Sequence, residues 1–386
     1  MNDQNRREFL QNSGKLMGAL ALFGSGANPL NAQEGNKMTN LKPLTTLPTR
    51  TLGTSGIKVS VLGLGCMSLA YGLGPAVGKE RAKEVIAKAI DLGVNFLDTA
   101  EVYGPFLDEE YVGYALSSSS LRQKVVLATK FGVHYRNVNG ENKQVIDARS
   151  SEIRKSIEGS LKRLKTDYID LYYQHRVDPN IPIEEVAGVI KDLQKEGKVL
   201  AWGLSEAGEQ TIKKAHKELA LSALQSEYSL WWREPEKSIF PTLKELNIAL
   251  VPFSPLGKGY LAGALDENTI FQKGDLRPVF PRYQKDALKQ NKALLNFLDE
   301  IAQTKQVNGK KATKAQIALA WILAQEDFII PIPGTTKIAH LEENLGALQI
   351  SFSENEMQEI NKKLSAIQIV GDRYPAGSDM AKRVGK

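Results

Sequence analysis

Short apolar runs alternate with one-faced helical patterns along most of this chain. After about residue 50, eight β-type runs are each followed by a segment whose apolar positions recur every three or four residues. The helical pattern is clearest over 82–90, 153–164 and 186–193. Such alternation predicts parallel strands joined by helices, and eight units predict an α/β fold of the closed (β/α)8 TIM-barrel type. The expected strands are residues 61–65, 95–100, 125–130, 168–175, 199–205, 223–228, 248–254 and 328–333.

Polar side chains end three successive runs. Asp98, Lys130 and His175 each follow an apolar segment, and Tyr103 lies five residues beyond the Asp. A parallel barrel brings the C-terminal ends of all its strands to one rim, so these four side chains could converge. Each of them alone is more often structural, since an Asp that closes a strand is usually a turn or N-cap residue. The complementary set favours a catalytic site.

The four side chains together could deliver a proton to a carbonyl oxygen. A Tyr hydroxyl has an unperturbed pKa of about 10, and an ammonium nearby lowers it, so Lys130 would make Tyr103 a better donor. Asp98 would keep a buried Lys130 charged, and a neutral His175 could hydrogen-bond the atom that Tyr103 protonates. These roles predict general acid catalysis.

Seven ordered motifs lie between about Arg50 and about Ser365, at residues 95–104, 128–132, 170–176, 202–205, 224–229, 253–259, and 332–337 with 340–344. Together they resemble the motifs of the aldo-keto reductase superfamily. The resemblance implies hydride transfer between NADP(H), rather than NAD(H), and the carbonyl carbon of an aldehyde, ketone or sugar, in either direction. Tyr103 would be the general acid/base, tuned by Lys130 and Asp98, and His175 would orient the substrate.

The same resemblance implies the cofactor contacts. Ser205 and Gln225 would hold the nicotinamide carboxamide, and Tyr228 would stack on the ring, although the residue pattern alone favours core packing for Tyr228. In barrels the loops after strands seven and eight commonly bind phosphate. The cofactor-binding residues expected there are Ser254, Leu256, Gly257, Lys258, Gly334, Thr335, Lys337, Glu343 and Asn344.

The sequence alone leaves alternatives for the 2′-phosphate contact and for the carboxamide contact. Lys337 is the candidate for the 2′-phosphate of NADP, and the alternative is a solvated lysine at a helix end. Glu343 and Asn344 would lie near the adenine. Many relatives have Asn after the serine, whereas this chain has Glu206, a departure from the family pattern directly beside Ser205.

Other cofactor and partner classes are not supported. The run Gly63-Leu64-Gly65 lacks the third glycine of a dinucleotide-binding fingerprint and is more typical of a first barrel strand. The four histidines show no metal-ligand spacing, and a single cysteine excludes a Cys-based zinc site. The net charge of +6 is spread among carboxylates, which favours a solvated surface over nucleic-acid binding.

Two segments look like additions to the barrel. Residues 257–290 are too long for an ordinary barrel loop and carry several glycines and prolines, so we expect a lid over the cofactor. The tail, 357–386, begins helically and would help to shape the substrate pocket, as such tails do in the family. An aromatic pocket lining is suggested by Trp231, Trp232, Tyr71 and Phe106.

The N-terminus predicts export. Residues 5–11, with Arg6 and Arg7, resemble a twin-arginine signal, and the apolar run 16–23 is too short to span a bilayer. Cleavage after Ala27 or Ala32 would leave a polar linker over 33–49 and the barrel with its tail over 50–386. The expected location is the periplasm of a bacterium, with transient contact to the export machinery and no stable membrane insertion. The alternative is a disordered basic leader, 1–32, on a cytoplasmic protein.

Two functional classes follow from the sequence. The favoured one is an NADP-dependent aldo-keto reductase with a small carbonyl or alcohol substrate. The alternative is a nicotinamide-binding module that senses redox state without significant turnover, like the potassium-channel β-subunit relatives.

Overall fold

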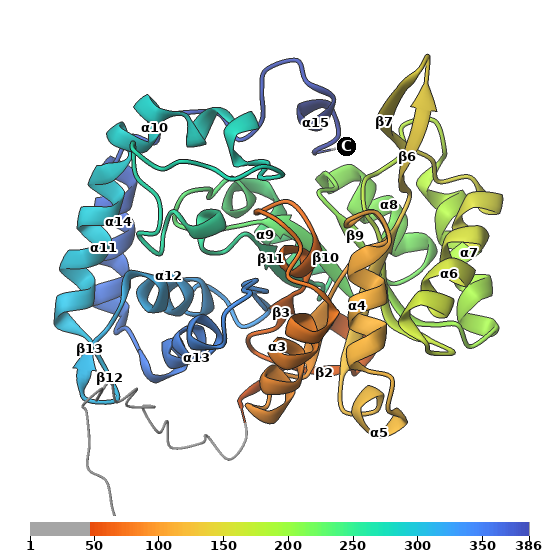
Figure 1. Cartoon of the computed structure of the whole chain (residues 1–386), viewed down its shortest axis with the longest axis horizontal. Helices are drawn as coiled ribbons and strands as arrows, with labels where there is room; N and C mark the ends of the chain where they lie inside the picture. Colours follow the sequence, from red (N-terminus) through yellow and green to blue (C-terminus); the bar gives the residue numbers. More distant parts are fainter. Residues whose placement is uncertain (1–46, 386) are drawn as a thin grey trace, which may run out of the picture. The chain divides into compact units, whose positions relative to one another are not determined.

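Parallel strands form a nearly closed barrel at the centre of residues 47–385, the part of the chain that this computed structural model describes (Figure 1). Seven of them pair in the order β11-β10-β9-β8-β5-β4-β3. Each lies on a predicted run, so the predicted fold class is confirmed. The strands are β3 Leu64–Gly65, β4 Phe96–Asp98, β5 Val126–Phe131, β8 Ile169–Gln174, β9 Val199–Ser205, β10 Ala223–Glu227 and β11 Ala249–Phe253.

The eighth predicted run, residues 328–333, lies between the two edge strands without forming a regular strand. Ile330 N donates to Leu250 O at 2.8 Å on one side, and Gly63 N donates to Pro331 O at 3.0 Å on the other. The run contains two prolines, which have no N–H to give. The ladder is therefore incomplete, but the segment still joins β11 to the β3 side of the barrel.

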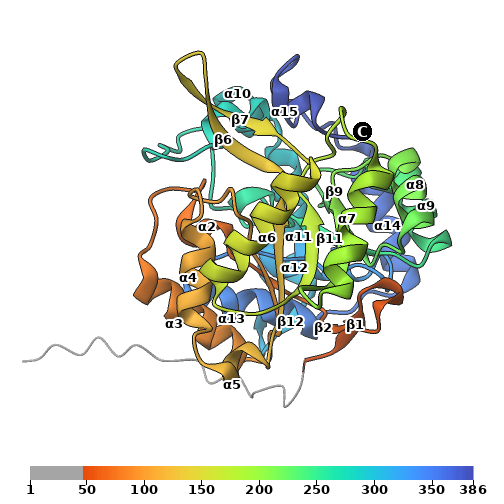
Figure 2. The same cartoon turned by 90° about the vertical axis from the view of Figure 1, so that its right-hand side faces the viewer.

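Helices cover the outside of the barrel (Figure 2). The residues of their apolar faces are buried against the strands. The three clearest helical patterns form α3 Lys79–Asp91, α6 Ser150–Leu164 and α7 Ile183–Lys195. Burial of each large aliphatic side chain on these faces contributes roughly 1.5–3 kcal/mol. The other helices are α2 Met67–Ala70, α4 Leu107–Ala115, α5 Ser119–Arg122, α8 Glu209–Glu218, α9 Pro235–Glu245, α10 Lys285–Gln290, α11 Lys292–Thr304, α12 Lys314–Leu323, α13 Ile338–Gly346, α14 Glu354–Ala366 and α15 Asp379–Lys382.

A hairpin fills the end of the barrel opposite the rim formed by the C-terminal ends of the strands. Its strands are β1 Thr49–Thr51 and β2 Lys58–Ser60. Leu52 and Val59 of this hairpin are fully buried and belong to the apolar cluster inside the barrel, together with Leu171. A site for a ligand must therefore lie at the opposite rim, where the strands end.

Three additions lie at that rim. A second hairpin, β6 Val133–Val138 with β7 Glu141–Ile146, projects there, and the C-terminal helix α15 lies next to it (Figures 1 and 2). The predicted lid contains α10 and the short 3-10 helices η2 Gly257–Gly259, η3 Arg277–Val279 and η4 Pro281–Tyr283. A small hairpin, β12 Gln306–Val307 with β13 Lys310–Lys311, lies away from this rim, beside α11 (Figure 1).

Some predictions fall outside the described residues. The predicted signal, 1–32, and nearly all of the linker, 33–49, precede residue 47. Within 47–385, no helix combines the length and the apolar character needed to cross a membrane. The same residues contain no group of three or more His, Cys, Asp or Glu side chains placed to hold a metal ion.

Candidate active site

Asp98, Tyr103, Lys130 and His175 meet at the C-terminal rim. Lys130 Nζ donates to Asp98 Oδ1 at 2.5 Å and lies 3.4 Å from the Tyr103 hydroxyl. The Tyr103 and His175 rings meet edge to face, with centroids 5.8 Å apart. Strands β4 and β5 carry the Asp and the Lys, while the Tyr and the His follow β4 and β8 in loops. Four positions that are distant in sequence thus form one cluster, as the order of the strands predicted.

Further hydrogen bonds hold the buried ion pair in place. Lys130 Nζ also donates to Thr99 O at 2.8 Å, and Gln225 Nε2 donates to the second carboxylate oxygen of Asp98 at 2.7 Å. Burial alone would lower the pKa of Lys130, but Asp98 and Tyr103 outweigh it and hold that pKa above its usual value. The lysine is therefore a fixed positive charge next to the Tyr hydroxyl. Sequence reasoning assigned Gln225 only to the cofactor and missed its bond to Asp98.

The two remaining side chains keep defined protonation states near neutral pH. Burial, with the charges of Arg176 and Lys130, lowers the pKa of His175 well below its usual value, so the ring is neutral. Burial raises the pKa of Tyr103, and Lys130 opposes this only in part. The predicted lowering of the Tyr103 pKa is thus wrong in its net direction, because burial outweighs the ammonium. A Tyr that keeps its proton is still suited to donate it.

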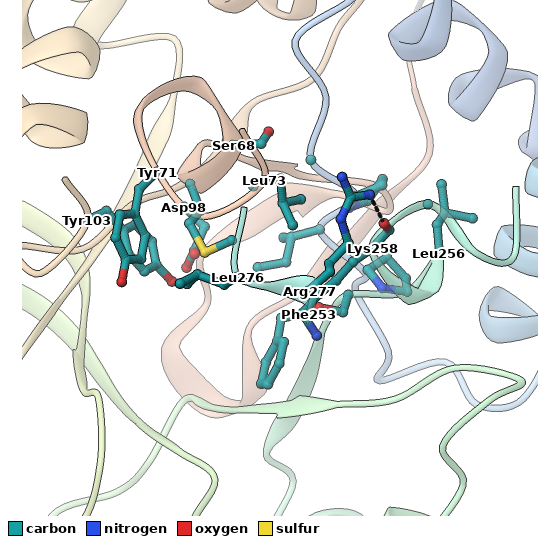
Figure 3. A pocket seen from close by; sticks show the side chains of 18 of the residues that line it. Ser68, Tyr71, Leu73, Asp98, Tyr103, Phe253, Leu256, Lys258, Leu276 and Arg277 are labelled. Carbon is teal, nitrogen blue, oxygen red and sulfur yellow. Dashed lines mark hydrogen bonds between the residues drawn. The ribbon is translucent and has the colours of Figure 1, made fainter. Parts of the chain in front are cut away.

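A cavity of about 990 Å³ extends from this cluster over the barrel rim. Figure 3 shows Tyr103 and Asp98 at one end and Lys258, Arg277 and Leu256 toward the other. Two polar atoms that line it, Ser68 Oγ and His175 Nδ1, are buried and have no hydrogen-bond partner among residues 47–385. The predicted cofactor residues that line the cavity are Ser205, Gln225, Ser254, Leu256, Lys258, Gly334, Thr335, Lys337, Glu343 and Asn344.

The donor set at the far end suits a dinucleotide phosphate. Lys258 and Lys337 come from the loops after β11 and after the eighth run, and helix α13 begins directly after Lys337. The Thr335 hydroxyl accepts from Lys337 N at 3.0 Å, which shapes this turn. Cations, a hydroxyl and a helix N-terminus are the groups that bind phosphate oxygens. The residues present therefore fit the nicotinamide dinucleotide that the sequence predicted.

The lid supplies a further cation that sequence reasoning missed. Arg277 donates to Lys258 O at 2.9 Å (Figure 3). It also forms an ion pair with Asp275 at 2.5 Å. Leu276 N donates to Gly72 O at 3.0 Å, so the lid is joined to the loop after β3. Arg277 lines the cavity. It lies in an irregular stretch with several glycines and prolines, where no periodicity of the sequence distinguishes it from the other basic residues.

Two of the predicted cofactor residues do not line the cavity. Tyr228 is fully buried, its ring stacks on Trp321 with centroids 5.6 Å apart, and its hydroxyl donates to Glu236 at 2.7 Å. Successive side chains of a strand alternate between its faces, so a residue three positions beyond Gln225 faces the helices and not the cavity. The ring-stacking prediction for Tyr228 is corrected accordingly. Gly257 turns its carbonyl to the Tyr283 hydroxyl, at 3.0 Å.

Tyrosines line the catalytic end of the cavity. The hydroxyls of Tyr71 and Tyr135 lie 2.8 Å apart, and the ring of Tyr71 stacks on Tyr103 with centroids 6.3 Å apart. The hairpin β6–β7 contributes Tyr135, and the tail contributes Tyr374. Of the predicted aromatic lining, only Tyr71 takes part. The others lie elsewhere: Trp231 stacks on Tyr260, Trp232 lies beneath Arg282 and Arg373, and Phe106 packs on Arg163 at the surface.

Glu206 faces away from the cavity. Its carboxylate accepts from Glu227 N at 2.8 Å and from the Ser226 hydroxyl at 3.0 Å, and it pairs with Arg373 of the tail at 2.6 Å. The residue after Ser205 therefore binds the C-terminal tail in this chain. Ser205, its neighbour, still lines the cavity and accepts from Arg176 at 3.0 Å.

A parallel barrel with a buried Lys–Asp pair, a Tyr and a neutral His at its rim, above a cavity suited to a dinucleotide, defines a class of carbonyl oxidoreductases. The chain belongs to the aldo/keto reductase family, whose model matches residues 61–365. It is therefore an oxidoreductase that acts on carbonyl or alcohol groups, and the family generally uses nicotinamide cofactors.

Individual relatives agree with this assignment. The chain is 42% identical to a probable aldo-keto reductase 1 of Glycine max over 328 residues. The aligned part covers 85% of this chain and 92% of the relative. A glycerol dehydrogenase from Gluconobacter oxydans is similar in structure, with a TM-score of 0.72, 27% identity, and coverage of 85% of this chain and 98% of that one. The holo form of an aldo-keto reductase from Bacillus halodurans gives a TM-score of 0.66 at 28% identity, with the same coverage.

Proposed function

We propose that this protein is an NADP(H)-dependent reductase of aldehydes, ketones or sugar carbonyls, with Tyr103 as the general acid and, in the reverse direction, the general base. One observation carries the proposal. The Tyr103 hydroxyl lies 3.4 Å from a buried ammonium that is itself fixed to Asp98, inside a cavity that a substrate can enter. A proton donor with a fixed charge next to it is what reduction of a carbonyl requires.

Each side chain has a separate part in this reaction. The nicotinamide, when bound, supplies the hydride. Tyr103 gives its proton to the carbonyl oxygen, and Lys130 stabilises the phenolate that remains. Asp98 keeps the ammonium charged and in place, and Gln225 fixes the carboxylate by its bond of 2.7 Å. His175 is neutral and can hydrogen-bond the same oxygen, which orients the carbonyl toward the Tyr hydroxyl.

The choice of NADP over NAD rests on the loop after the eighth run. Lys337 is exposed, lines the cavity, and precedes the first turn of α13. An extra phosphate at this place would meet both an ammonium and the helix N-terminus. Lys258 and Arg277 would hold the bridging phosphates, Ser205 and Gln225 the carboxamide, and Glu343 and Asn344 the adenine end.

A turnover assay tests the function. Purified protein is mixed with NADPH and with a panel of small aldehydes, ketones and sugars, and the loss of the NADPH absorbance is followed. We expect consumption with at least one class of carbonyl and none without a carbonyl. If NADPH binds, as followed by its fluorescence, but no member of the panel consumes it, the protein is a cofactor-binding module and the proposal fails.

We also propose that the first 32 residues direct export through the twin-arginine route. Support comes from the Arg6-Arg7 pair and the short apolar run that follows it. That route carries folded proteins, so the cofactor could be bound before export. The mature protein would then be periplasmic.

A further inference from the structure

Two arginines line the catalytic end of the cavity. Arg176 follows His175 directly, and its guanidinium donates to the carbonyl of His175 at 2.6 Å and to the Ser205 hydroxyl at 3.0 Å. Arg383 comes from the end of the C-terminal tail and donates to Gln144 O of strand β7 at 2.7 Å. The tail and the hairpin β6–β7 thus meet at Arg383, which lines the cavity.

Neither guanidinium forms an ion pair with a carboxylate of residues 47–385. Their acceptors are two carbonyls and a hydroxyl, all of them neutral. Both side chains are half-buried. Burial lowers the pKa of Arg383; Asp379 opposes this, and the charge of Arg176 adds to it. The charge of each arginine therefore acts on the other. Asp379, an acid near Arg383, is exposed and lies 3.8 Å from Lys382. The Glu206 carboxylate, which lies near Arg176, is already paired with Arg373 at 2.6 Å.

Unpaired cations in a partly desolvated wall carry an electrostatic cost that an anionic ligand would offset. The phosphates of the cofactor are not that ligand, because the residues suited to them come from the other side of the rim, on the lid and on the loops after β11 and residues 328–333. Arg176 instead adjoins His175, whose ring meets the Tyr103 ring edge to face. The charge thus lies where the substrate, and not the dinucleotide, would extend.

We propose that Arg176 and Arg383 form an anion subsite that selects carbonyl substrates carrying a carboxylate or a phosphate on the part remote from the carbonyl. Guanidinium groups bind both kinds of oxyanion through charge-assisted hydrogen bonds. This inference rests on the proposed carbonyl reductase function and names its substrate class. Tyr71, Tyr135 and Tyr374 would then contact the part of the substrate between the two charged ends.

The test compares charged and neutral carbonyls that are otherwise alike. The first pair is para-carboxybenzaldehyde and its methyl ester, and the second is glyceraldehyde phosphate and glyceraldehyde. Values of kcat/KM are measured for wild type, for Arg383→Gln and for the matched control Lys382→Gln, which removes the same charge from the adjacent exposed residue. Binding of the alcohol products, para-(hydroxymethyl)benzoate and its methyl ester, is measured by calorimetry in the same variants.

We expect wild type to prefer the charged member of at least one pair, and Arg383→Gln to lower kcat/KM for that member by about tenfold, the size of one partly exposed charge-assisted hydrogen bond. For the neutral members, kcat/KM of Arg383→Gln should stay within about twofold of the wild-type value, and Lys382→Gln should stay within about twofold of wild type for every substrate. The substrate pair that shows this loss tells whether the subsite binds a carboxylate or a phosphate. Equal losses for charged and neutral members, or an equal loss in Lys382→Gln, overturn the subsite but leave the reductase function standing. If no carbonyl is reduced and the acid product still binds more tightly than its ester in an Arg383-dependent way, the function fails and the subsite stands.

Discussion

Glu206, at the end of strand β9, binds Arg373 of the C-terminal tail across a distance of 2.6 Å, and both side chains are buried. Arg373 also pairs with Glu227 at 2.5 Å, and Glu227 in turn pairs with Arg282 of the lid at 2.9 Å. Two carboxylates at the ends of neighbouring strands therefore hold the tail and the lid together. The lid carries Lys258 and Arg277, so this network also fixes the wall of the cofactor cavity.

Loss of Arg373 should destabilise the protein and weaken cofactor retention. Arg373→Met leaves two buried carboxylates with one arginine, and breaking such a pair costs about 3–5 kcal/mol in free energy of unfolding. Urea unfolding would measure this loss, and stopped-flow fluorescence would show faster release of NADPH. The exposed Lys362→Met serves as the control. Unchanged unfolding in Arg373→Met would show that the tail is held by its apolar contacts alone.

Removal of the Tyr103 hydroxyl should abolish most of the turnover. Tyr103→Phe keeps the ring beside His175 but has no proton to give, so carbonyl reduction should slow by at least about a hundredfold, as expected for lost general acid catalysis. NADPH affinity, measured by fluorescence titration, should remain. Tyr111→Phe, on the outer helix α4, is the control and should behave as wild type. Near-native turnover in Tyr103→Phe would remove this residue as the proton donor.

Lys337 should give the protein a higher affinity for NADPH than for NADH. If it meets the 2′-phosphate, Lys337→Ala loses a charge-assisted contact of roughly 1.5–3 kcal/mol, which corresponds to about a ten- to hundredfold lower affinity for NADPH. Affinity for NADH should barely change, because NADH has no such phosphate. Lys310→Ala, in the remote hairpin β12–β13, controls for net charge. An equal loss for both cofactors would place Lys337 elsewhere than at the 2′-phosphate.

The sequence predicted most of the barrel and the catalytic cluster because both follow from strand periodicity. Asp98, Lys130 and His175 were found since strand ends share one rim, whatever their distance along the chain. Tyr228 was misplaced because the side of a strand that a residue faces depends on its exact register. The hairpin at 133–146 has no long apolar run, although its turn, Asn139-Gly140, has the positive φ angles of 54° and 85° that this pair favours in hairpins.

Contacts made by the tail could not have been predicted in the same way. Arg373 and Arg383 lie in an irregular segment, where no periodicity says which way a side chain points. Their partners, Glu206 and the carbonyl of Gln144, are far away in sequence. Only the folded chain brings them together.

Glu101 should make the stability of the protein depend on pH. Burial, helped by the charge of Glu109, raises the pKa of Glu101 to about 8 from the usual 4.5. The folded state thus holds a proton that the unfolded state loses, so stability should fall as pH rises from about 4.5 to 8, on the order of 1 kcal/mol per pH unit.

The variant Glu101→Gln tests this directly. An amide oxygen can still accept from Gly132 N and the Ser156 hydroxyl, which lie 3.1 and 3.2 Å from the carboxylate, but it cannot ionise. Urea unfolding between pH 5 and pH 8 should show a weaker pH dependence than wild type, with the largest gain at pH 8. The exposed Glu359→Gln should follow wild type. Parallel pH profiles for Glu101→Gln and wild type would mean that Glu101 is ionised in the folded protein.

Export should depend on the arginine pair and not on the barrel. A chain that begins near Lys42 contains the whole fold, so it should fold, bind NADPH and work in the cytoplasm with unchanged kinetics. The full-length chain should instead fractionate with the periplasm, shortened near Ala27 or Ala32, as mass spectrometry would show. Replacing Arg6 and Arg7 together by Lys keeps the charge but removes the recognised pair, so the uncut and active precursor should stay inside. If the wild-type chain remains in the cytoplasm at full length, the first 32 residues are a basic leader without a role in export.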